Sequence, residues 1–162
     1  LGVEVDFMRY GSPTGRILAS VPSDKELLLV HNTFITEQDI EAVQERFGEH
    51  VTWVVCPRSN DFIEGVFPPV DLLRRCGGRI AVGTDSLSSN ERLSLIDELK
   101  CFPSVPLEER LRWATIGGAR ALGLEDRIGS FEIGKTPAAV VLSGIAWSDM
   151  SLLPDATTRR VL

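Results

Sequence analysis

The stretch Arg79-Ile-Ala-Val-Gly-Thr-Asp85-Ser-Leu-Ser-Ser-Asn90 decides the fold, because a short apolar strand in it ends in a carboxylate. The apolar run 26–30 leads in the same way into His31 and Asn32. A third run, 51–55, leads into Cys56-Pro-Arg58-Ser59-Asn60. Apolar runs without polar alternation predict parallel strands that are covered on both faces. The sequence therefore predicts an α/β fold in which three strands end in reactive side chains.

Helical patterns follow each predicted strand. Thr36-Glu-Gln-Asp39 has the spacing of a capping box and predicts an amphipathic helix after it. A loop over 61–65 and a short helix over 70–73 follow the second strand. Ser88-Ser-Asn-Glu91 has capping spacing and predicts the next helix, and helical spacing recurs from Leu107 to Ala121. Three successive βα units define an α/β fold but do not close a barrel, which takes about 250 residues.

The two ends of the chain are less regular. Residues 3–8 predict a short strand and residues 11–15 a turn. Residues 128–135 predict a turn-rich hairpin, and 138–142 a strand outside the βα rhythm. Residues 143–162 carry no clear pattern. The chain opens without a methionine, so we expect it to be a piece of a longer polypeptide.

Composition narrows the class of protein. The 162 residues have 43% hydrophobic and 25% charged content, as in one globular domain. A net charge of −6 without a basic stripe predicts no nucleic-acid partner. No apolar run approaches the roughly 20 residues that span a bilayer, so no membrane association is expected. Cys56, Cys76 and Cys101 lack metal-like or disulfide-like spacing, which predicts plain thiols and a cytoplasmic location.

Side chains at the carboxyl ends of parallel strands meet on one rim. That rim is catalytic in barrels and is the ligand crevice in open sheets. We therefore expect His31 and Asp85 to be neighbours although they are far apart in the sequence. A metal ligand or a general base would fit such a position.

On these residues the chain resembles the C-terminal part of a metal-dependent amidohydrolase, in the branch with aminopurine deaminases and chlorohydrolases. The motifs that carry the resemblance stand in the family's order and spacing. They are Val30-His-Asn-Thr33, Cys56-Pro-Arg-Ser-Asn60, Gly83-Thr-Asp-Ser-Leu-Ser-Ser-Asn90, Ala114-Thr-Ile-Gly-Gly-Ala-Arg-Ala-Leu-Gly-Leu124 and Ile128-Gly-Ser-Phe-Glu-Ile-Gly-Lys135.

The resemblance implies that residues 1–127 are the later βα units of a TIM-type (β/α)8 barrel. Residues 128–162 would then be the returning part of a small β-sandwich and a C-terminal tail. It also implies that His31 and Asp85 are catalytic. Asp85 would help bind a divalent metal, with zinc favoured, and pass protons, while His31 would polarise or orient the group under attack.

Arg58, Ser59 and Asn60 are the predicted substrate contacts on the same rim. Turn chemistry explains Ser59 and Asn60 equally well, and an exposed salt bridge explains Arg58 equally well. Ser86, Ser88 and Asn90 are interpreted as capping residues in preference to substrate ligands.

Several metal ligands of the family have no counterpart here. The His-x-His pair and the fifth-strand His and Glu are absent, and the only other histidine, His50, is predicted to lie on the surface. One imidazole and one carboxylate are too few, because a catalytic zinc has three protein ligands. We therefore expect little or no metal and no activity in this chain alone. Cys56 in place of the commoner His, and Thr136-Pro-Ala-Ala139 in place of Lys-Ala-Asp, indicate a divergent branch.

The favoured hypothesis is a parent hydrolase that attacks a C–N bond of an aminated heterocycle, most simply an adenine-type nucleoside. A chlorohydrolase or amide hydrolase is the nearest alternative. Another hypothesis is a non-catalytic domain or remnant that forms a homo-oligomer, because a partial barrel exposes unpaired strand edges. An open receiver-like domain with Asp85 as acceptor is the least favoured.

Overall fold

A computed structural model describes residues 9–161, so the strand expected over 3–8 lies outside the described residues. In chain order the elements are α1 (Pro13–Ser20), β1 (Leu27–Val30), α2 (Glu37–Phe47), η1 (Gly48–His50), β2 (Val51–Val55), α3 (Pro57–Glu64), α4 (Val70–Arg75), β3 (Ile80–Val82), α5 (Leu95–Lys100), α6 (Leu107–Arg112), η2 (Trp113–Gly117), α7 (Gly118–Ala121), β4 (Val140–Ala146) and β5 (Ser151–Arg160).

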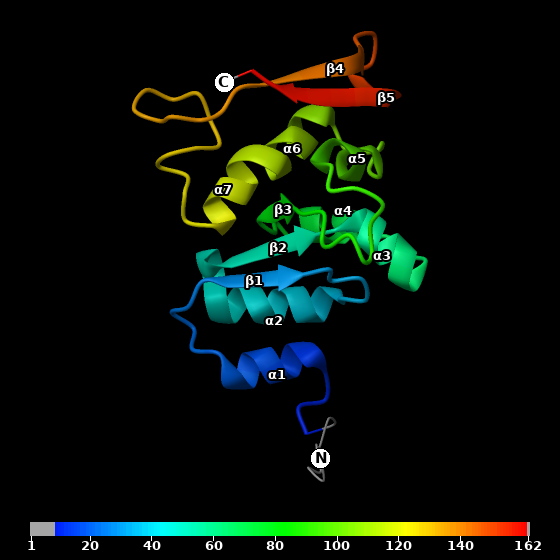
Figure 1. The fold of residues 1–162 in the computed structure, drawn as a ribbon. Coiled ribbons are helices and arrows are strands. Elements are labelled where there is room, and N and C mark those ends of the chain that lie inside the picture. The colour runs from blue at the N-terminus through cyan, green and yellow to red at the C-terminus, as the bar shows by residue number, and fades with distance from the viewer. Residues whose placement is uncertain (1–8, 162) are drawn as a thin grey trace.

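The three predicted strands form one parallel sheet in the order β1-β2-β3. Leu27 pairs with Val51, and Trp53 pairs with Ile80. Helix α2 packs against β2, and η2 and α7 pack against β3 (Figure 1). The predicted α/β class with a parallel sheet is confirmed. All three strands end on the same side of the molecule, where the chain continues into α3 and the loops that follow β1 and β3 (Figure 1).

The core lies where the sheet meets its helices. Trp53 has no solvent exposure and Trp113 is 5% exposed, as predicted for core residues. Trp113 packs edge-on against Phe102, with ring centroids 5.9 Å apart. Such aromatic pairs stabilise a core by about 0.5–1.5 kcal/mol beyond the area that they bury.

Strand β1 corrects the expectation that all strands are covered on both faces. Leu29 is buried, but Leu28 is 42% exposed and Val30 is 48% exposed. β1 is an edge strand, and no element of residues 9–161 covers the face that carries Leu28 and Val30. The central strand β2 and the opposite edge strand β3 are almost fully buried, as predicted.

The start of α2 was predicted correctly. Thr36 Oγ1 accepts a hydrogen bond from the Asp39 backbone N–H at 3.2 Å, and Asp39 Oδ2 accepts from the Thr36 N–H at 3.1 Å. This reciprocal capping box satisfies two backbone donors that a helix start leaves free.

Other local predictions were wrong. Residues 61–65 belong to helix α3 and its cap, because Pro57 starts the helix and Gly65 ends it in a left-handed conformation at φ 67°. The predicted turn over 11–15 is the start of α1, with Ser12 as its cap. Helix α5 begins at Leu95 rather than after Ser88–Glu91, because the Ser88 hydroxyl contacts Ser86 and the Glu91 carboxylate accepts from Arg58.

Elements α6, η2 and α7 form one helix with a π-helical stretch in the middle. This stretch lies against β3, and a Cβ on Gly117 would lie 2.6 Å from the Ile80 carbonyl oxygen. Glycine at 117 therefore permits the close approach of helix and strand.

The C-terminal part forms turns and a separate hairpin. Residues 128–135 contain turns but no paired strand, so the hairpin expected there is absent. The strand predicted at 138–142 is β4, which pairs antiparallel with β5 through Val140 and Arg160. Helix α5 packs against β5. No helix within residues 9–161 is long and apolar enough to cross a membrane.

Candidate active site at the strand ends

Strained backbone marks the carboxyl ends of β1 and β3. Within residues 9–161 the non-glycine residues with positive φ are His31 at 72°, Asn32 at 57°, Asp85 at 56° and Met150 at 55°. Three of these four lie within three residues of the end of a strand of the parallel sheet. Such conformations are uncommon for residues with a Cβ, and they cluster at functional sites when the surrounding structure holds them.

The turn after β1 is held by hydrogen bonds to its neighbours. The His31 backbone N–H donates to the Val54 carbonyl of β2 at 2.9 Å. The Asn32 amide donates to the Leu29 carbonyl at 2.7 Å. These bonds compensate the strain, and they fix the point from which the imidazole of His31 projects.

Two serine hydroxyls hold the carboxylate of Asp85. Ser59 Oγ and Ser89 Oγ each donate to Asp85 Oδ2 at 2.7 Å, and the two hydroxyl oxygens lie 2.9 Å apart. These bonds, first from Ser89 and then from Ser59, lower the pKa of Asp85, and the charge of His31 acts in the same direction. Asp85 is therefore ionised at neutral pH, with Oδ2 held by the two hydroxyls.

His31 and Asp85 contact consecutive residues of α3, Asn60 and Ser59, as expected if the strand ends share one rim. Their strands are not adjacent, since β2 lies between β1 and β3. The imidazole of His31 contacts the side chain of Asn60, which is 1% exposed. Asn60 Oδ1 lies 3.3 Å from His31 Nδ1, and Asn60 Nδ2 donates to Thr33 Oγ1.

The three predicted substrate contacts lie in the first turn of α3. Ser59 and Asn60 are buried and bonded to Asp85 and His31 respectively. Arg58 turns elsewhere: its Nη2 donates to Glu91 Oε2 at 3.2 Å, and its Nη1 lies 4.0 Å from Asp97 Oδ2. The structure therefore joins Ser59 to Asp85 and Asn60 to His31, but it joins Arg58 to neither.

Glu98 on α5 connects the two loops that carry the site. It has no solvent exposure. Its Oε2 accepts from the Arg58 backbone N–H at 3.0 Å, and its Oε1 accepts from Asn90 Nδ2 at 2.6 Å. Burial raises the pKa of Glu98, although the hydrogen bonds oppose that shift. Glu98 thereby ties the start of α3, which carries Ser59, to the loop that carries Ser89.

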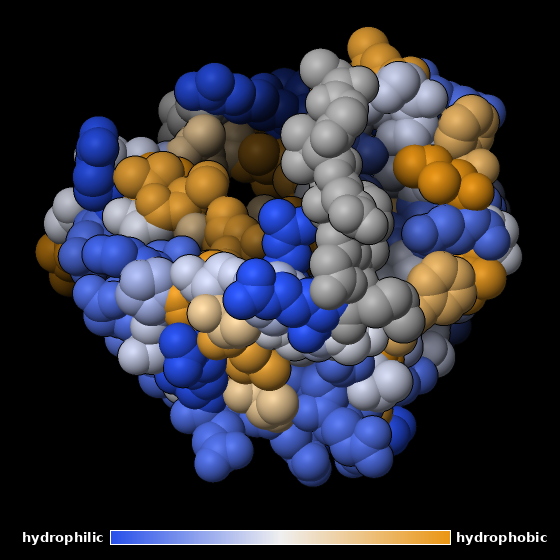
Figure 2. All heavy atoms as spheres, turned by 90° about the horizontal axis from the view of Figure 1, so that it is seen from below, coloured by the Kyte–Doolittle hydropathy of each residue, from blue (hydrophilic) through white to orange (hydrophobic). Residues whose placement is uncertain are grey.

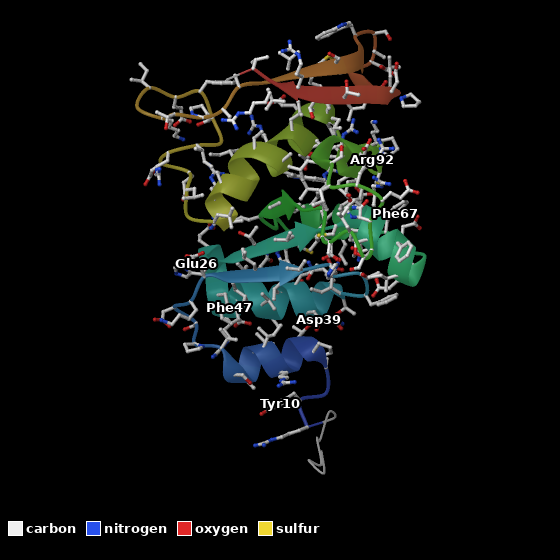
Figure 3. The ribbon with its side chains drawn as sticks, viewed as in Figure 1. Tyr10, Glu26, Asp39, Phe47, Phe67 and Arg92 are labelled. Carbon is white, nitrogen blue, oxygen red and sulfur yellow. The ribbon has the colours of Figure 1, made fainter. Side chains whose placement is uncertain are left out.

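A cleft of about 270 Å³ lies beside this network. Figure 3 shows Phe67, one of its lining residues, at the side of the molecule where the strands end, opposite Glu26 at the start of β1. The cleft combines aromatic, polar and charged side chains, as small-molecule sites commonly do. Its lining includes Arg58, Phe62, Phe67, Ser89, Asn90 and Cys101.

The donor set does not fit a metal ion by itself. No group of three His, Cys, Asp or Glu side chains within residues 9–161 is placed to hold one. Cys56 lies near Asp85, but burial, with the charges of Asp85 and Glu98, raises the pKa of its thiol to about 11. A protonated thiol is a poor ligand, because the thiolate is the form that binds metals. His31 and Asp85 are one ligand short of the three that a catalytic zinc needs.

Sequence reasoning missed Ser89, Thr33 and Glu98 as members of the site. For Ser89 a signal existed, since it stands four residues after Asp85 in a short polar turn. For Glu98 there was none, because a glutamate in a predicted helix is normally expected at the surface. The predicted surface position of His50 is confirmed, because its side chain is 49% exposed and paired with Glu26.

The chain belongs to the amidohydrolase family, whose model matches residues 8–159. The resemblance to this family stated from the sequence is thereby confirmed.

The curated relatives are longer than this chain. The 5-methylthioadenosine/S-adenosylhomocysteine deaminase of Thermoanaerobacter pseudethanolicus is 31% identical over 152 residues, which are 86% of this chain and 35% of that enzyme. The chain thus spans about a third of the length of such relatives.

Two solved structures are similar in fold and sequence. An adenosine deaminase from Xanthomonas campestris with bound zinc shares 37% identity at a TM-score of 0.63, covering 70% of this chain and 28% of that one. The aminofutalosine deaminase of Helicobacter pylori, in complex with methylthio-coformycin, shares 33% identity at a TM-score of 0.59, covering 69% and 28%.

Proposed function

We propose that this chain is the C-terminal part of a hydrolase that removes the amino group from an aminated heterocycle, with adenine-type nucleosides favoured. One observation carries the proposal. In a chain of the amidohydrolase family, His31 and Asp85 come from strands that are not neighbours and meet at the strand ends. The relatives' names, which include deaminases of adenosine and 5-methylthioadenosine, support the choice of substrate class.

The proposal includes the domain organisation and the location. Residues 1–127 would supply the later βα units of a (β/α)8 barrel, and residues 128–162 the returning part of a small β-sandwich with a tail. The parallel sheet and the separate hairpin β4–β5 support this division. A cytoplasmic location is supported by the free thiols of Cys56, Cys76 and Cys101.

In the proposed reaction, water adds to the ring carbon that bears the amino group, and the amine leaves as ammonia. Asp85 is ionised, so Oδ1 can accept a proton from the attacking water and return it to the leaving nitrogen. Ser59 and Ser89 keep Oδ2 fixed during this transfer. His31 orients the group under attack. A positioned acid or base of this kind contributes about 10²–10⁴ in rate.

No step is assigned to a metal ion, because the part of the chain from residue 9 to residue 161 contains no group of three donors placed to hold one. We expect this chain alone to retain substoichiometric zinc after dialysis, as measured by elemental analysis. Stoichiometric zinc retained against a chelator would contradict the ligand count. In the complete enzyme, the other ligands would come from outside this chain.

Among the predicted substrate contacts, Arg58 is the one proposed to face a ligand, because it lines the cleft beside Ser89. Ser59 is proposed to act through Asp85, since its side chain has no solvent exposure.

A hybrid enzyme tests the function. The matching segment of the Thermoanaerobacter deaminase is replaced by this chain, and ammonia release from 5-methylthioadenosine is measured. We expect an active hybrid, loss of at least about 10³ in kcat with Asp85→Asn, and loss of about 10²–10⁴ with His31→Gln. His50→Gln is the matched control, because His50 is an exposed histidine outside the site, and it should leave kcat unchanged.

Two results would contradict the proposal. One is a folded hybrid that stays inactive under conditions in which the unaltered deaminase works. The other is full activity in the Asp85→Asn hybrid. Release of chloride from a chlorinated ring, without release of ammonia, would support the chlorohydrolase alternative.

The self-associating alternative is favoured by the open face of β1. Leu28 and Val30 are exposed on this edge strand, and the face of the molecule seen from the α1 side carries apolar patches among charged ones (Figure 2). Exposed edges promote pairing with another chain. This alternative predicts a dimer by light scattering that Leu28→Lys with Val30→Lys converts to a monomer, whereas a monomeric starting protein contradicts it.

A further inference from the structure

Asn60 holds its carboxamide in one orientation. Both ends of the group are engaged with the loop after β1, since Nδ2 donates to Thr33 Oγ1 and Oδ1 lies 3.3 Å from His31 Nδ1. The side chain is 1% exposed, so water does not compete for these contacts. The oxygen therefore faces the imidazole, while the NH₂ faces the threonine.

This orientation determines which ring nitrogen of His31 carries the proton. An amide oxygen only accepts hydrogen bonds, so His31 Nδ1 must donate in this contact. A neutral imidazole carries one ring proton, and Nε2 is then left with a free lone pair. No side chain within residues 9–161 makes a hydrogen bond with His31 Nε2 that would fix the opposite tautomer.

We propose that Asn60 is a positioning residue that fixes His31 as the Nδ1–H tautomer, with Nε2 as the acceptor that meets the substrate or the attacking water. The inference rests on the proposed function and narrows the part that His31 plays in it. Neutral His31 then receives a hydrogen bond from the attacking water. It does not donate one to the oxygen that becomes negative in the adduct.

The backbone and Thr33 support this arrangement. His31 is held at φ 72° by its bond to Val54, so the base of the side chain cannot shift along the strand. Thr33 Oγ1 accepts a hydrogen bond from the NH₂ group of Asn60 and helps to hold the carboxamide in place. Asn60 Oδ1, which lies beside Nδ1, then selects the tautomer of His31.

The test uses ¹⁵N NMR of the 162-residue chain at alkaline pH, where imidazoles are neutral. The chain has only two histidines, and His50→Gln assigns the remaining signals to His31. Protonated and unprotonated ring nitrogens have well-separated ¹⁵N shifts, and their couplings to the ring protons tell Nδ1 from Nε2. We expect a protonated Nδ1 in His31, whereas free histidine favours the proton on Nε2.

Three variants complete the test. Asn60→Asp keeps an acceptor opposite Nδ1 and should preserve the tautomer. Asn60→Leu removes the acceptor, and Thr33→Val releases the carboxamide, so each should shift His31 toward the Nε2–H form. If Asn60→Leu does not fold, as judged by its amide spectrum, Thr33→Val decides.

The inference is overturned by a wild-type His31 protonated on Nε2, or by a tautomer that stays unchanged in either folded variant. The readout needs no substrate. An inactive hybrid enzyme combined with an Asn60-dependent tautomer would therefore contradict the proposed function and leave this inference intact.

Discussion

The two ends of the parallel sheet are built in different ways. At the carboxyl end, buried polar side chains bond one another, and the backbone takes strained conformations at His31 and Asp85. At the amino end, the polar pairs His50–Glu26 and Arg79–Glu49 lie at the surface. A larger cleft of about 550 Å³ also lies at the amino end, but it is far from the strained residues and the paired serines.

This difference shows that buried polar contacts hold the side chains in position at the carboxyl end of the sheet, whereas they do not at the amino end. Buried polar networks specify one arrangement when every member is satisfied, and they are costly when one partner is lost. Exposed ion pairs contribute little. Polar side chains at the carboxyl end should therefore be sensitive to single substitutions, whereas the exposed polar pairs at the amino end should tolerate them.

The largest effect is expected from Glu98→Ala. The substitution leaves the Arg58 N–H and the Asn90 amide without their buried acceptor, and it opens a cavity in the core. We expect a loss of about 2–5 kcal/mol in the free energy of unfolding, measured in urea. Glu49→Ala is the matched control at the amino end, where no change is expected because its side chain is 92% exposed. Equal losses in the free energy of unfolding for the two variants would contradict the proposed difference between the two ends of the sheet.

The next largest loss of stability is expected at Gly117, where the helix backbone lies close to strand β3. A Cβ at Gly117 would lie 2.6 Å from the Ile80 carbonyl oxygen, so Gly117→Ala should cost about 1–3 kcal/mol. At the neighbouring Gly118 the nearest atom lies 3.9 Å away, and Gly118→Ala should stabilise the helix by about 0.5–1 kcal/mol. Thermal unfolding of both variants gives the comparison, and destabilisation by both would contradict the assigned contact.

The pH dependence of stability should separate the two carboxylates of the site. Burial raises the pKa of Glu98 above its ordinary value of 4.5, so the folded protein binds its proton more tightly than the unfolded chain does. Stability then falls as the pH rises from about 4.5 through the folded pKa. The pKa of Asp85 is lowered, so its contribution is present above 3.8 and is lost as the pH falls through its folded pKa.

Urea unfolding of Glu98→Gln between pH 4.5 and 7 checks this assignment. The variant cannot ionise at position 98, so it should lack the decline in stability that Glu98 causes in the wild type. Identical slopes in the two proteins would show that Glu98 does not titrate as inferred.

The smallest effect is expected at the exposed pair of His50 and Glu26. Their side chains are 49% and 71% exposed, so the ion pair is screened by water and salt. Glu26→Gln should change the free energy of unfolding by less than about 0.5 kcal/mol. A larger loss would mean that the amino end also depends on specific polar contacts.

Local features explain most of what was predicted. The strands at 27–30, 51–55 and 80–82 and the capping box of Thr36 depend on residues that are close in the sequence. Helix α3 was missed although Pro57 and Gly65 mark its two ends, because its buried residues include the polar Ser59 and Asn60 instead of an apolar set. The start of α5 was misplaced because Ser88–Glu91 offers a cap that the tertiary structure uses elsewhere.

The sequence by itself determined the class of fold and the pair His31 and Asp85, because short apolar runs and the residues after them are local signals. Only the tertiary structure decided what holds that pair. Ser59 reaches Asp85 across 26 positions of the chain, and Arg58 reaches Glu98 across 40. Such contacts depend on how the strands pack side by side. The spacing of residues within one helix or strand does not predict contacts between residues so far apart in the sequence.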